Sequence, residues 1–169
     1  MSLLGIDPGL HGALCYMGRD GVILDLMDMP VLQVKPKSKK VSLDYHGLAA
    51  LVKEWRPDHA FVEQVWAMPA HRRPGPTGEI RAEGFTSVMV GVYMAVLATL
   101  TTAGIPWTPV APRTWQASLK VPGGKDGSRA RASQLMPADA GRWTRVKDDG
   151  RAESALIALH GLRQIDSNS

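Results

Sequence analysis

The sequence is poor in the residues that build disulfide-rich or membrane-spanning proteins. Only one of its 169 residues is cysteine and only two are phenylalanine. With Cys15 alone, no intramolecular disulfide can form and no cysteine-based metal site is expected. No uncharged apolar run approaches the roughly 18 residues that a membrane span requires. The first residues do not resemble a signal peptide, because a basic start is missing and Asp7 interrupts the apolar stretch. We therefore expect a cytoplasmic protein without a membrane segment.

The charged residues are ordinary in number but uneven in distribution. The net charge is +4, and hydrophobic residues make up 44% of the chain. Such a mildly basic balance favours nucleic-acid binding only slightly. Lysines and arginines, however, gather in a few segments that are mostly rich in glycine and proline and therefore predicted to be loops. The candidates for DNA contact are Lys35, Lys37, Arg72, Arg73, Lys120, Lys125 and Arg129.

Length and patterning predict one α/β domain over residues 1–163, followed by a short C-terminal tail, 164–169. Three short apolar runs at 2–6, 12–17 and 22–27 are separated by turn signals, which indicates an antiparallel meander of three strands. Further strands are predicted at 60–65 and 105–110; the latter contains two prolines, which are typical of an edge strand. The expected fold is a mixed five-stranded sheet, with the meander plus parallel strands, flanked by helices on both faces.

The helices are predicted from apolar spacing and from capping residues. Ser42 is expected to cap the first helix, which ends before Pro57. The segments 30–40 and 68–78 are predicted to be loops. The predicted helices span 42–55, 83–103, 113–119, 128–135 and 150–162.

Two carboxylates stand at the ends of buried strands. Asp7 follows an apolar run that begins the chain, and Glu63 ends the apolar stretch 60–62. A carboxylate beside buried positions is costly unless a cation or hydrogen bonds compensate it. The alternative is that Asp7 caps the turn at Pro8 and that Glu63 points to solvent by strand alternation.

A second acidic pair precedes the last apolar helix. Asp149 and Glu153 are four residues apart and therefore share one helix face. An N-terminal cap favoured by the helix dipole explains Asp149 well. It explains Glu153 poorly, because Ala152, Ala155 and Leu156 around it are predicted to be buried.

Four carboxylates on one site suit Mg²⁺ or Mn²⁺ better than zinc. Two such ions about 4 Å apart activate a water and stabilise the leaving oxygen of a phosphodiester. Without a cation, mutual repulsion raises the pKa of some of the carboxyls. An acidic centre rimmed by basic loops is the charge layout of a metal-dependent nuclease.

Motifs along most of the chain resemble the RuvC family of Holliday-junction resolvases. They are Gly-Ile-Asp-Pro-Gly-Leu at 5–10 with Gly12, Val-Glu-Gln-Val at 62–65, and the helix segment 152–158. The small-residue helix at 87–98, the segment 106–115 and Gly123-Gly124-Lys125 with Ser128 resemble the family in the same order. Three acidic motifs at this spacing are fairly specific.

The resemblance implies an RNase H-like fold, a homodimer and Mg²⁺-dependent, symmetric cleavage of four-way DNA junctions, in a bacterial cell or a phage-infected host. By match, Asp7, Glu63 and Glu153 are metal ligands, with Asp149 completing a catalytic set that holds two ions. The dimer is expected to nick opposing strands.

This chain departs from the family pattern in several positions. Glu153 stands where the family usually has Asp, and Gly150 stands where it has Asp or His. The choice of Asp149 over Asp148 as the fourth ligand therefore stays open. Gln116 replaces a frequent lysine, so part of the phosphate contact is assigned to Lys120 or Lys125.

Two other functions remain open from the sequence. One is a different RNase H-like nuclease that acts on RNA/DNA hybrids or on RNA. The other is a catalytically inactive protein that binds junctions, which is favoured if Glu153 disables metal binding. For base stacking at a junction, Trp66 competes with Phe85 and Met68, and packing is the alternative for Trp66.

Overall fold

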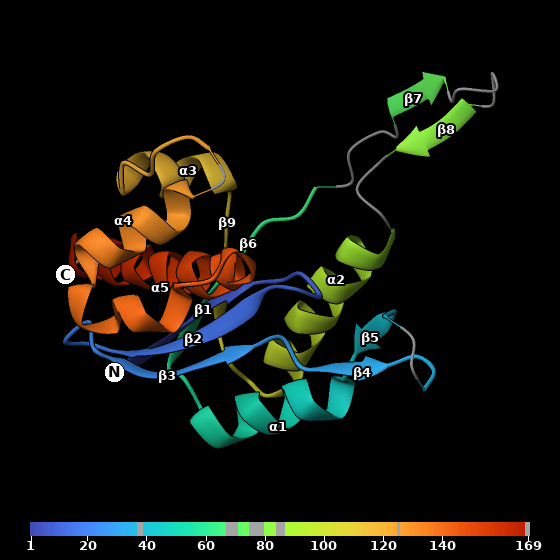
Figure 1. Cartoon of the computed structure of the whole chain (residues 1–169). Coiled ribbons are helices and arrows are strands. Elements are labelled where there is room, and N and C mark those ends of the chain that lie inside the picture. Colours follow the sequence, from blue (N-terminus) through green and yellow to red (C-terminus); the bar gives the residue numbers. More distant parts are fainter. Residues whose placement is uncertain (37–38, 67–70, 75–79, 84–86, 125, 168–169) are drawn as a thin grey trace.

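The computed structural model describes residues 1–36, 39–66, 71–74, 80–83, 87–124 and 126–167; for 71–74, 80–83 and Ser87 it describes the backbone alone. The elements follow one another along the chain as shown in Figure 1. The strands are β1 (Ser2–Asp7), β2 (Ala13–Gly18), β3 (Ile23–Asp28), β4 (Val31–Gln33), β5 (Val41–Leu43), β6 (His59–Glu63), β7 (His71–Pro74), β8 (Ile80–Glu83) and β9 (Trp107–Val110). The helices are α1 (Tyr45–Trp55), α2 (Ser87–Thr102), α3 (Pro112–Ser118), α4 (Gly127–Leu135) and α5 (Asp149–Ser167), with 3-10 helices η1 (Pro137–Trp143) and η2 (Val146–Asp148).

The main sheet has five strands in the order β3-β2-β1-β6-β9. Strands β1, β2 and β3 form the antiparallel meander, and β6 and β9 extend it in parallel from β1. The predicted mixed sheet is therefore confirmed. Strand β9 is an edge strand, and its Pro109 is exposed, as the prolines predicted.

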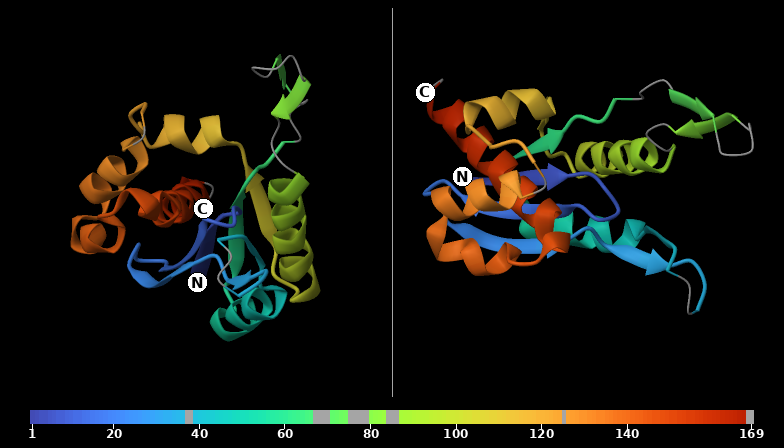
Figure 2. Two further views of the ribbon diagram at one scale, coloured as in Figure 1. Left: turned by 45° about the vertical axis from the view of Figure 1, so that its right-hand side comes forward. Right: turned by 45° about the horizontal axis from the view of Figure 1, so that its top comes forward.

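Helices cover both faces of this sheet, as Figure 2 shows. Alternation along β1 sends Leu4 and Ile6 into the core shared with α1 and α2, and Leu3 into the core shared with α3, α4 and α5. Both cores are built from buried aliphatic residues together with a few aromatic ones. The sheet is thus buried on both sides, and α5 crosses its central strands on one of them.

Several predicted boundaries are wrong. Ser42 lies in β5, and the helix is capped by Asp44, whose side chain accepts a 2.9 Å hydrogen bond from the Gly47 backbone N–H. The predicted loops 30–40 and 68–78 contain β4 and β7, each of which pairs in a small hairpin. Helix α5 continues to Ser167, so most of the predicted tail is helical. The 3-10 helix η1 was not predicted. No helix in the described part of the chain is long and apolar enough to cross a membrane.

Helix α5 lies so close to β1 that the contact tolerates no side chain on Gly5. A Cβ at Gly5 would lie 2.2 Å from the Ser154 carbonyl oxygen and 2.4 Å from the Ala158 backbone nitrogen. Since both neighbours are backbone atoms, neither can move aside without shifting the helix.

We predict that Gly5→Ala lowers the free energy of unfolding by about 1–3 kcal/mol or more through overpacking. Gly91→Ala is the matched control, because nothing lies within 4 Å of a Cβ there and the residue is inside a helix. It should raise stability by about 0.5–1 kcal/mol. Urea unfolding of both variants measures the difference, and a tolerated Gly5→Ala would contradict the close contact.

Candidate active site

Two of the predicted site carboxylates leave neighbouring parallel strands at the same edge of the sheet. Asp7 ends β1 and Glu63 ends β6, each one residue beyond the paired Ile6 and Val62. Leu3 and Phe61 face the α5 side of the sheet. By alternation, Asp7 and Glu63 face the same side. The sequence prediction that these two acids meet is consistent with this geometry.

Helix α5 brings the third carboxylate to this edge. Its residue Glu153 is half-buried, and its charge acts on both Asp7 and Glu63. Burial raises the pKa of Asp7, and the charges of Glu153 and then Glu63 raise it further. Burial likewise raises the pKa of Glu63 to about 7, although a hydrogen bond from Trp115 opposes the rise. The pKa of Glu153 is also raised, first by burial. Asp7, Glu63 and Glu153 therefore form one carboxylate cluster.

Two hydrogen bonds orient the flanking acids of this cluster. The Trp115 indole N–H donates to Glu63 Oε1 at 3.0 Å, and the Ser128 hydroxyl donates to Glu153 Oε1 at 3.0 Å. These donors come from α3 and α4. Neither contact was predicted from the sequence, because the pattern does not show which buried groups meet across the fold.

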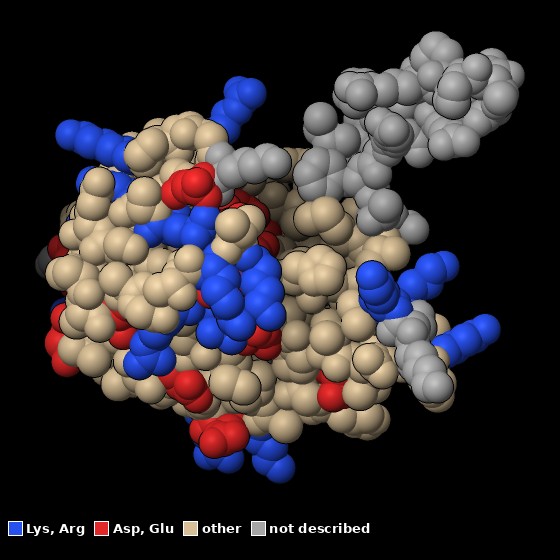
Figure 3. All heavy atoms as spheres, in the orientation of Figure 1, with Lys and Arg blue, Asp and Glu red and all other residues tan. Residues whose placement is uncertain are grey.

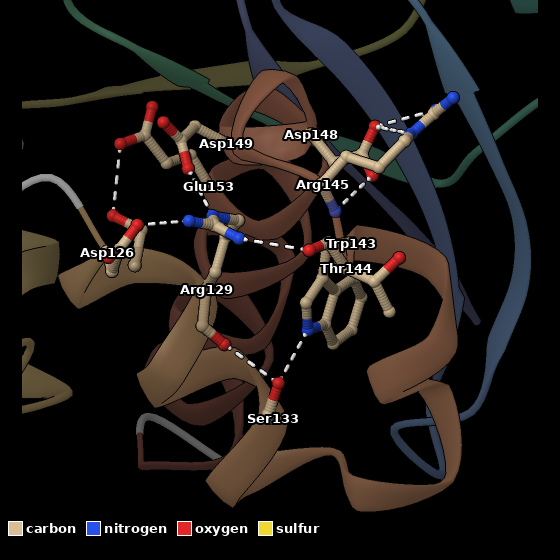
Figure 4. Close-up of polar contacts among 10 residues, drawn as sticks. Asp126, Arg129, Ser133, Trp143, Thr144, Arg145, Asp148, Asp149 and Glu153 are labelled. Atoms are coloured by element: carbon tan, nitrogen blue, oxygen red, sulfur yellow. Dashed lines mark hydrogen bonds and ion pairs between the residues drawn. The ribbon is translucent and has the colours of Figure 1, made fainter.

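Asp149 lies at the margin of the cluster and is bound to an arginine. Its Oδ1 accepts a 2.7 Å hydrogen bond from Arg129 Nε (Figure 4). The same guanidinium contacts Asp126 and donates to the Thr144 carbonyl at 3.2 Å. The charge of Asp149 raises the pKa of Glu153. Asp149 is therefore next to Glu153, but its carboxylate is engaged by Arg129.

Asp148 has a structural role. Its side chain is 4% exposed, and Arg145 Nη2 donates to its Oδ1 at 2.8 Å. Its Oδ2 accepts the Arg145 backbone N–H at 2.9 Å, which closes a capping box around η2. The Arg145 hydrogen bond holds the pKa of Asp148 below its usual value. Of the two candidates that the sequence left open, Asp149 is therefore the one beside the cluster.

Gly150 lies where the structure leaves no room for a side chain. A Cβ built there would lie 2.9 Å from Asp7 Oδ2, 2.7 Å from the His11 carbonyl oxygen and 2.8 Å from the Gly12 Cα. The start of α5 is thus pressed against the β1–β2 turn. No side chain fits at position 150 without moving that turn, so an acid cannot stand there in this arrangement.

The three acids are chemically suited to bind a hard divalent cation. Such an ion prefers carboxylate oxygens and would neutralise their mutual repulsion. The side chains of the cluster are not gathered around one point, however. Among the residues whose side chains the structure describes, no three His, Cys, Asp or Glu residues are arranged closely enough to hold a metal ion. The carboxylates would therefore hold a cation only after their side chains reorient toward it.

The basic candidates fall into three groups. Lys35 and Lys120 are exposed, while Arg129 is engaged as described above. Lys37 and Lys125 lie outside the described residues, and Arg72 and Arg73 lie on β7, for which only the backbone is described. On the face shown in Figure 3, Lys and Arg atoms are spread widely, with one patch near the centre and others toward the right, and Asp and Glu atoms lie beside the central patch. An open groove of about 480 Å³ on the molecule is lined by His11, Gly12, Asp28, Lys147, Asp149 and Gly150.

Burial of the Glu63 carboxyl, reinforced by the charge of Glu153, predicts a stability cost in the absence of a cation. The folded-state pKa of Glu63 is about 7, above its model-peptide value of 4.5, so its contribution is fully favourable below about 4.5 and is lost as the pH rises through 7. Glu63→Gln should therefore raise the free energy of unfolding by roughly 1–3 kcal/mol at pH 8 with EDTA. The gain should shrink as the pH falls from 8 to 5.

Chemical unfolding across this pH range measures the effect. Glu54→Gln, at an exposed position on α1, is the control and should leave the pH profile unchanged. A Glu63→Gln variant that is less stable than the wild type at pH 8 would show that the cluster is not under electrostatic strain.

Comparison with known proteins finds relatives whose sequences are similar to that of this chain. No protein-family profile matches it. It is 28% identical to the crossover junction endodeoxyribonuclease RuvC of Chloroflexus aggregans over 167 residues, which covers 94% of this chain and 91% of that protein. It is 33% identical to RuvC of Marinobacter nauticus over 70 residues, 38% of each chain.

Solved structures show the same fold. RuvC of Thermus thermophilus in complex with a Holliday junction substrate aligns with a TM-score of 0.61 and 16% identity, covering 98% of this chain and 96% of the other. A second structure of Thermus thermophilus RuvC aligns with a TM-score of 0.59 and 18% identity, covering 97% and 96%. The predicted RNase H-like fold is therefore confirmed. In sequence and in fold, this chain is similar to the RuvC crossover junction endodeoxyribonucleases over nearly its whole length, as its motifs predicted.

Proposed function

We propose that this protein is a metal-dependent endonuclease that resolves four-way DNA junctions by paired, symmetric nicks during DNA recombination and repair. The observation that carries the proposal is the cluster of Asp7, Glu63 and Glu153, whose pKa values are all raised, on a RuvC-like fold. Relatives named for crossover junction cleavage support the choice of substrate. We place its action inside a bacterial cell or a phage-infected host.

The residues of the cluster would hold Mg²⁺ or Mn²⁺, with two ions per site. When bound, such ions would supply an activated water and would stabilise the leaving oxygen of the phosphodiester. Glu153 and Glu63 both raise the pKa of Asp7, so Asp7 is close to both acids and would hold a cation together with them. The Ser128 hydroxyl holds one oxygen of Glu153 in place, which fixes the longer side chain at this position.

Asp149 is the proposed fourth ligand, and Arg129 controls its availability. In the DNA-free protein, Arg129 binds Asp149 at 2.7 Å. A DNA phosphate presents the same hard oxygens to a guanidinium and would compete for it. When Arg129 turns to the phosphate, the Asp149 carboxylate becomes free to bind a cation beside Glu153. Phosphate contact by Arg129 and ligation by Asp149 are then parts of one exchange.

The remaining basic candidates would hold the DNA backbone on either side of the cluster. Lys35 and Lys120 are exposed and suited to this role. We assign the same role to Lys37, Lys125, Arg72 and Arg73 from their sequence context. Contacts of this kind to phosphates carry no base specificity and weaken as salt rises.

Paired nicks require two active sites, so we propose a homodimer. Helix α2 supports this proposal, because Val88 and Met94 on it are 50% and 56% exposed although both are apolar. An apolar surface on a helix is suited to burial against a second copy. Two sites related by a two-fold axis match the symmetry of a four-way junction.

The exchange at Arg129 yields one prediction. Asp149→Asn should raise the Mg²⁺ concentration for half-maximal cleavage by about 10-fold or more, as the loss of a cation ligand or its support does. Asp126→Asn is the matched control, since Asp126 also contacts Arg129 but its side chain is 74% exposed. It should change the Mg²⁺ requirement by much less. Equal effects of the two variants would mean that Asp149 acts only as a partner of Arg129.

The cleavage reaction itself yields another prediction. Wild-type protein should introduce paired nicks into a mobile four-way junction only when Mg²⁺ is present. Asp7→Asn should abolish cleavage, while junction binding survives or tightens because a negative charge beside the phosphates is removed. Asp166→Asn, an exposed position near the end of α5, is the control and should cleave normally.

The substrates in this assay separate the alternatives. Linear duplex and an RNA/DNA hybrid should remain uncut under conditions that resolve the junction. Cutting of the hybrid at an equal rate would indicate a different RNase H-like nuclease. Junction binding without cleavage in either Mg²⁺ or Mn²⁺ would indicate an inactive binding protein.

A further inference from the structure

We propose that Trp115 is a positioning residue for Glu63, fixing one carboxylate oxygen so that the other is presented to the cation; this inference rests on the proposed function. Trp115 is fully buried on α3, and its indole N–H donates to Glu63 Oε1 at 3.0 Å. An indole nitrogen is a donor only, so it can hold a carboxylate but cannot replace it as a ligand. Groups that hold a metal ligand in this way tune the affinity of the site.

Trp115 is itself held in place through its own backbone. The Ser118 hydroxyl donates to the Trp115 carbonyl oxygen at 3.0 Å. A hydroxyl carries a single proton, so when Ser118 donates it to Trp115, the 2.6 Å contact between Ser118 Oγ and His160 Nδ1 uses a proton on the histidine. His160 is 4% exposed, and its Nε2 has no hydrogen-bond partner among the described residues. This assigns a neutral imidazole with its proton on Nδ1.

The donors then run in one direction toward the site. The His160 ring donates to Ser118, Ser118 donates to the Trp115 backbone, and the Trp115 ring donates to Glu63. His160 is on α5, seven residues and about two turns after Glu153, so the two lie on the same face of that helix. Helix α5 therefore places Glu153 directly and Glu63 by way of α3. The distance between Glu63 and Glu153 is therefore controlled by α5.

The alternative is that Trp115 only fills the core between α3, α5 and the sheet. Trp143 provides a matched comparison for this role. It is 1% exposed, and its indole N–H also donates at 3.0 Å, but to the Ser133 hydroxyl (Figure 4). Trp115→Phe and Trp143→Phe therefore remove the same atoms and one hydrogen bond each from buried positions. Only Trp115→Phe removes a bond to a carboxylate of the cluster.

The test measures cation affinity in two ways. The first is the Mg²⁺ concentration for half-maximal junction cleavage, together with kcat at saturating Mg²⁺. The second is Mn²⁺ binding without DNA, followed by electron paramagnetic resonance of the free ion, with Asp7→Asn as the variant that lacks the site. We expect Trp115→Phe to raise the half-maximal Mg²⁺ concentration and to lower the Mn²⁺ affinity, each by about 10-fold or more. Trp143→Phe should leave both quantities near their wild-type values. Replacing Trp115 with 3-benzothienylalanine, which keeps the shape and lacks the N–H, should reproduce the Trp115→Phe result in a fully folded protein.

Each outcome separates the two proposals. If the wild type cleaves junctions with Mg²⁺ and the Trp115 variants have the cation affinity of Trp143→Phe, the positioning role is overturned and the proposed function stands. If 3-benzothienylalanine restores the wild-type affinity that Trp115→Phe loses, packing and not the N–H is responsible, and the positioning role is again overturned. A wild type that does not cleave in any divalent cation would overturn the proposed function itself, while Mn²⁺ binding still reports on Trp115.

Discussion

The mutual repulsion of three half-buried carboxylates at one edge of the sheet is the interaction on which the rest of the structure depends. Asp7 and Glu63 are brought together by the parallel pairing of β1 and β6, and Glu153 is added by α5. Burial and like charge each disfavour the ionised forms, so the protein alone does not compensate this arrangement. A fold that holds such a cluster together has to be rigid around it. The close contact of α5 with Gly5, which brings helix backbone against the strand, supplies that rigidity.

The acidic residues around the cluster are paired with arginines, in contrast to the cluster itself. Three neighbouring aspartates are each neutralised by an arginine: Asp148 by Arg145, Asp149 by Arg129, and Asp28 by Arg151. The cluster itself has hydrogen bonds from a neutral indole and a neutral hydroxyl in place of a cationic partner. Neutral donors orient a carboxylate without cancelling its charge. The carboxylates that are to meet a cation therefore keep their charge, while the surrounding acids are paired.

The sequence predicted those features that depend on local pattern. Apolar runs that end in an acid gave the strands and the positions of Asp7 and Glu63, and the two prolines at 105–110 indicated the edge strand. Features that depend on tertiary contact were missed or left open. The cap at Asp44 in place of Ser42, the hairpins containing β4 and β7, and the pairing of Asp148 with Arg145 require knowledge of which groups meet across the fold. Trp115 has the sequence signature of a core residue, and only its partner in space distinguishes it.

The departure at Gly150 shows how the far end of the site is built. The start of α5 lies against the β1–β2 turn so closely that a Cβ at Gly150 would contact Asp7 Oδ2 at 2.9 Å. An acid at that position would have to push the helix away from Asp7 and would also move Glu153, three residues along the same helix. A glycine allows the helix to approach, and a glutamate at 153 reaches one methylene further than an aspartate would. Its end is then held by Ser128 from α4. The close approach at 150 and the longer side chain at 153 are therefore linked, because both depend on the position of the same helix.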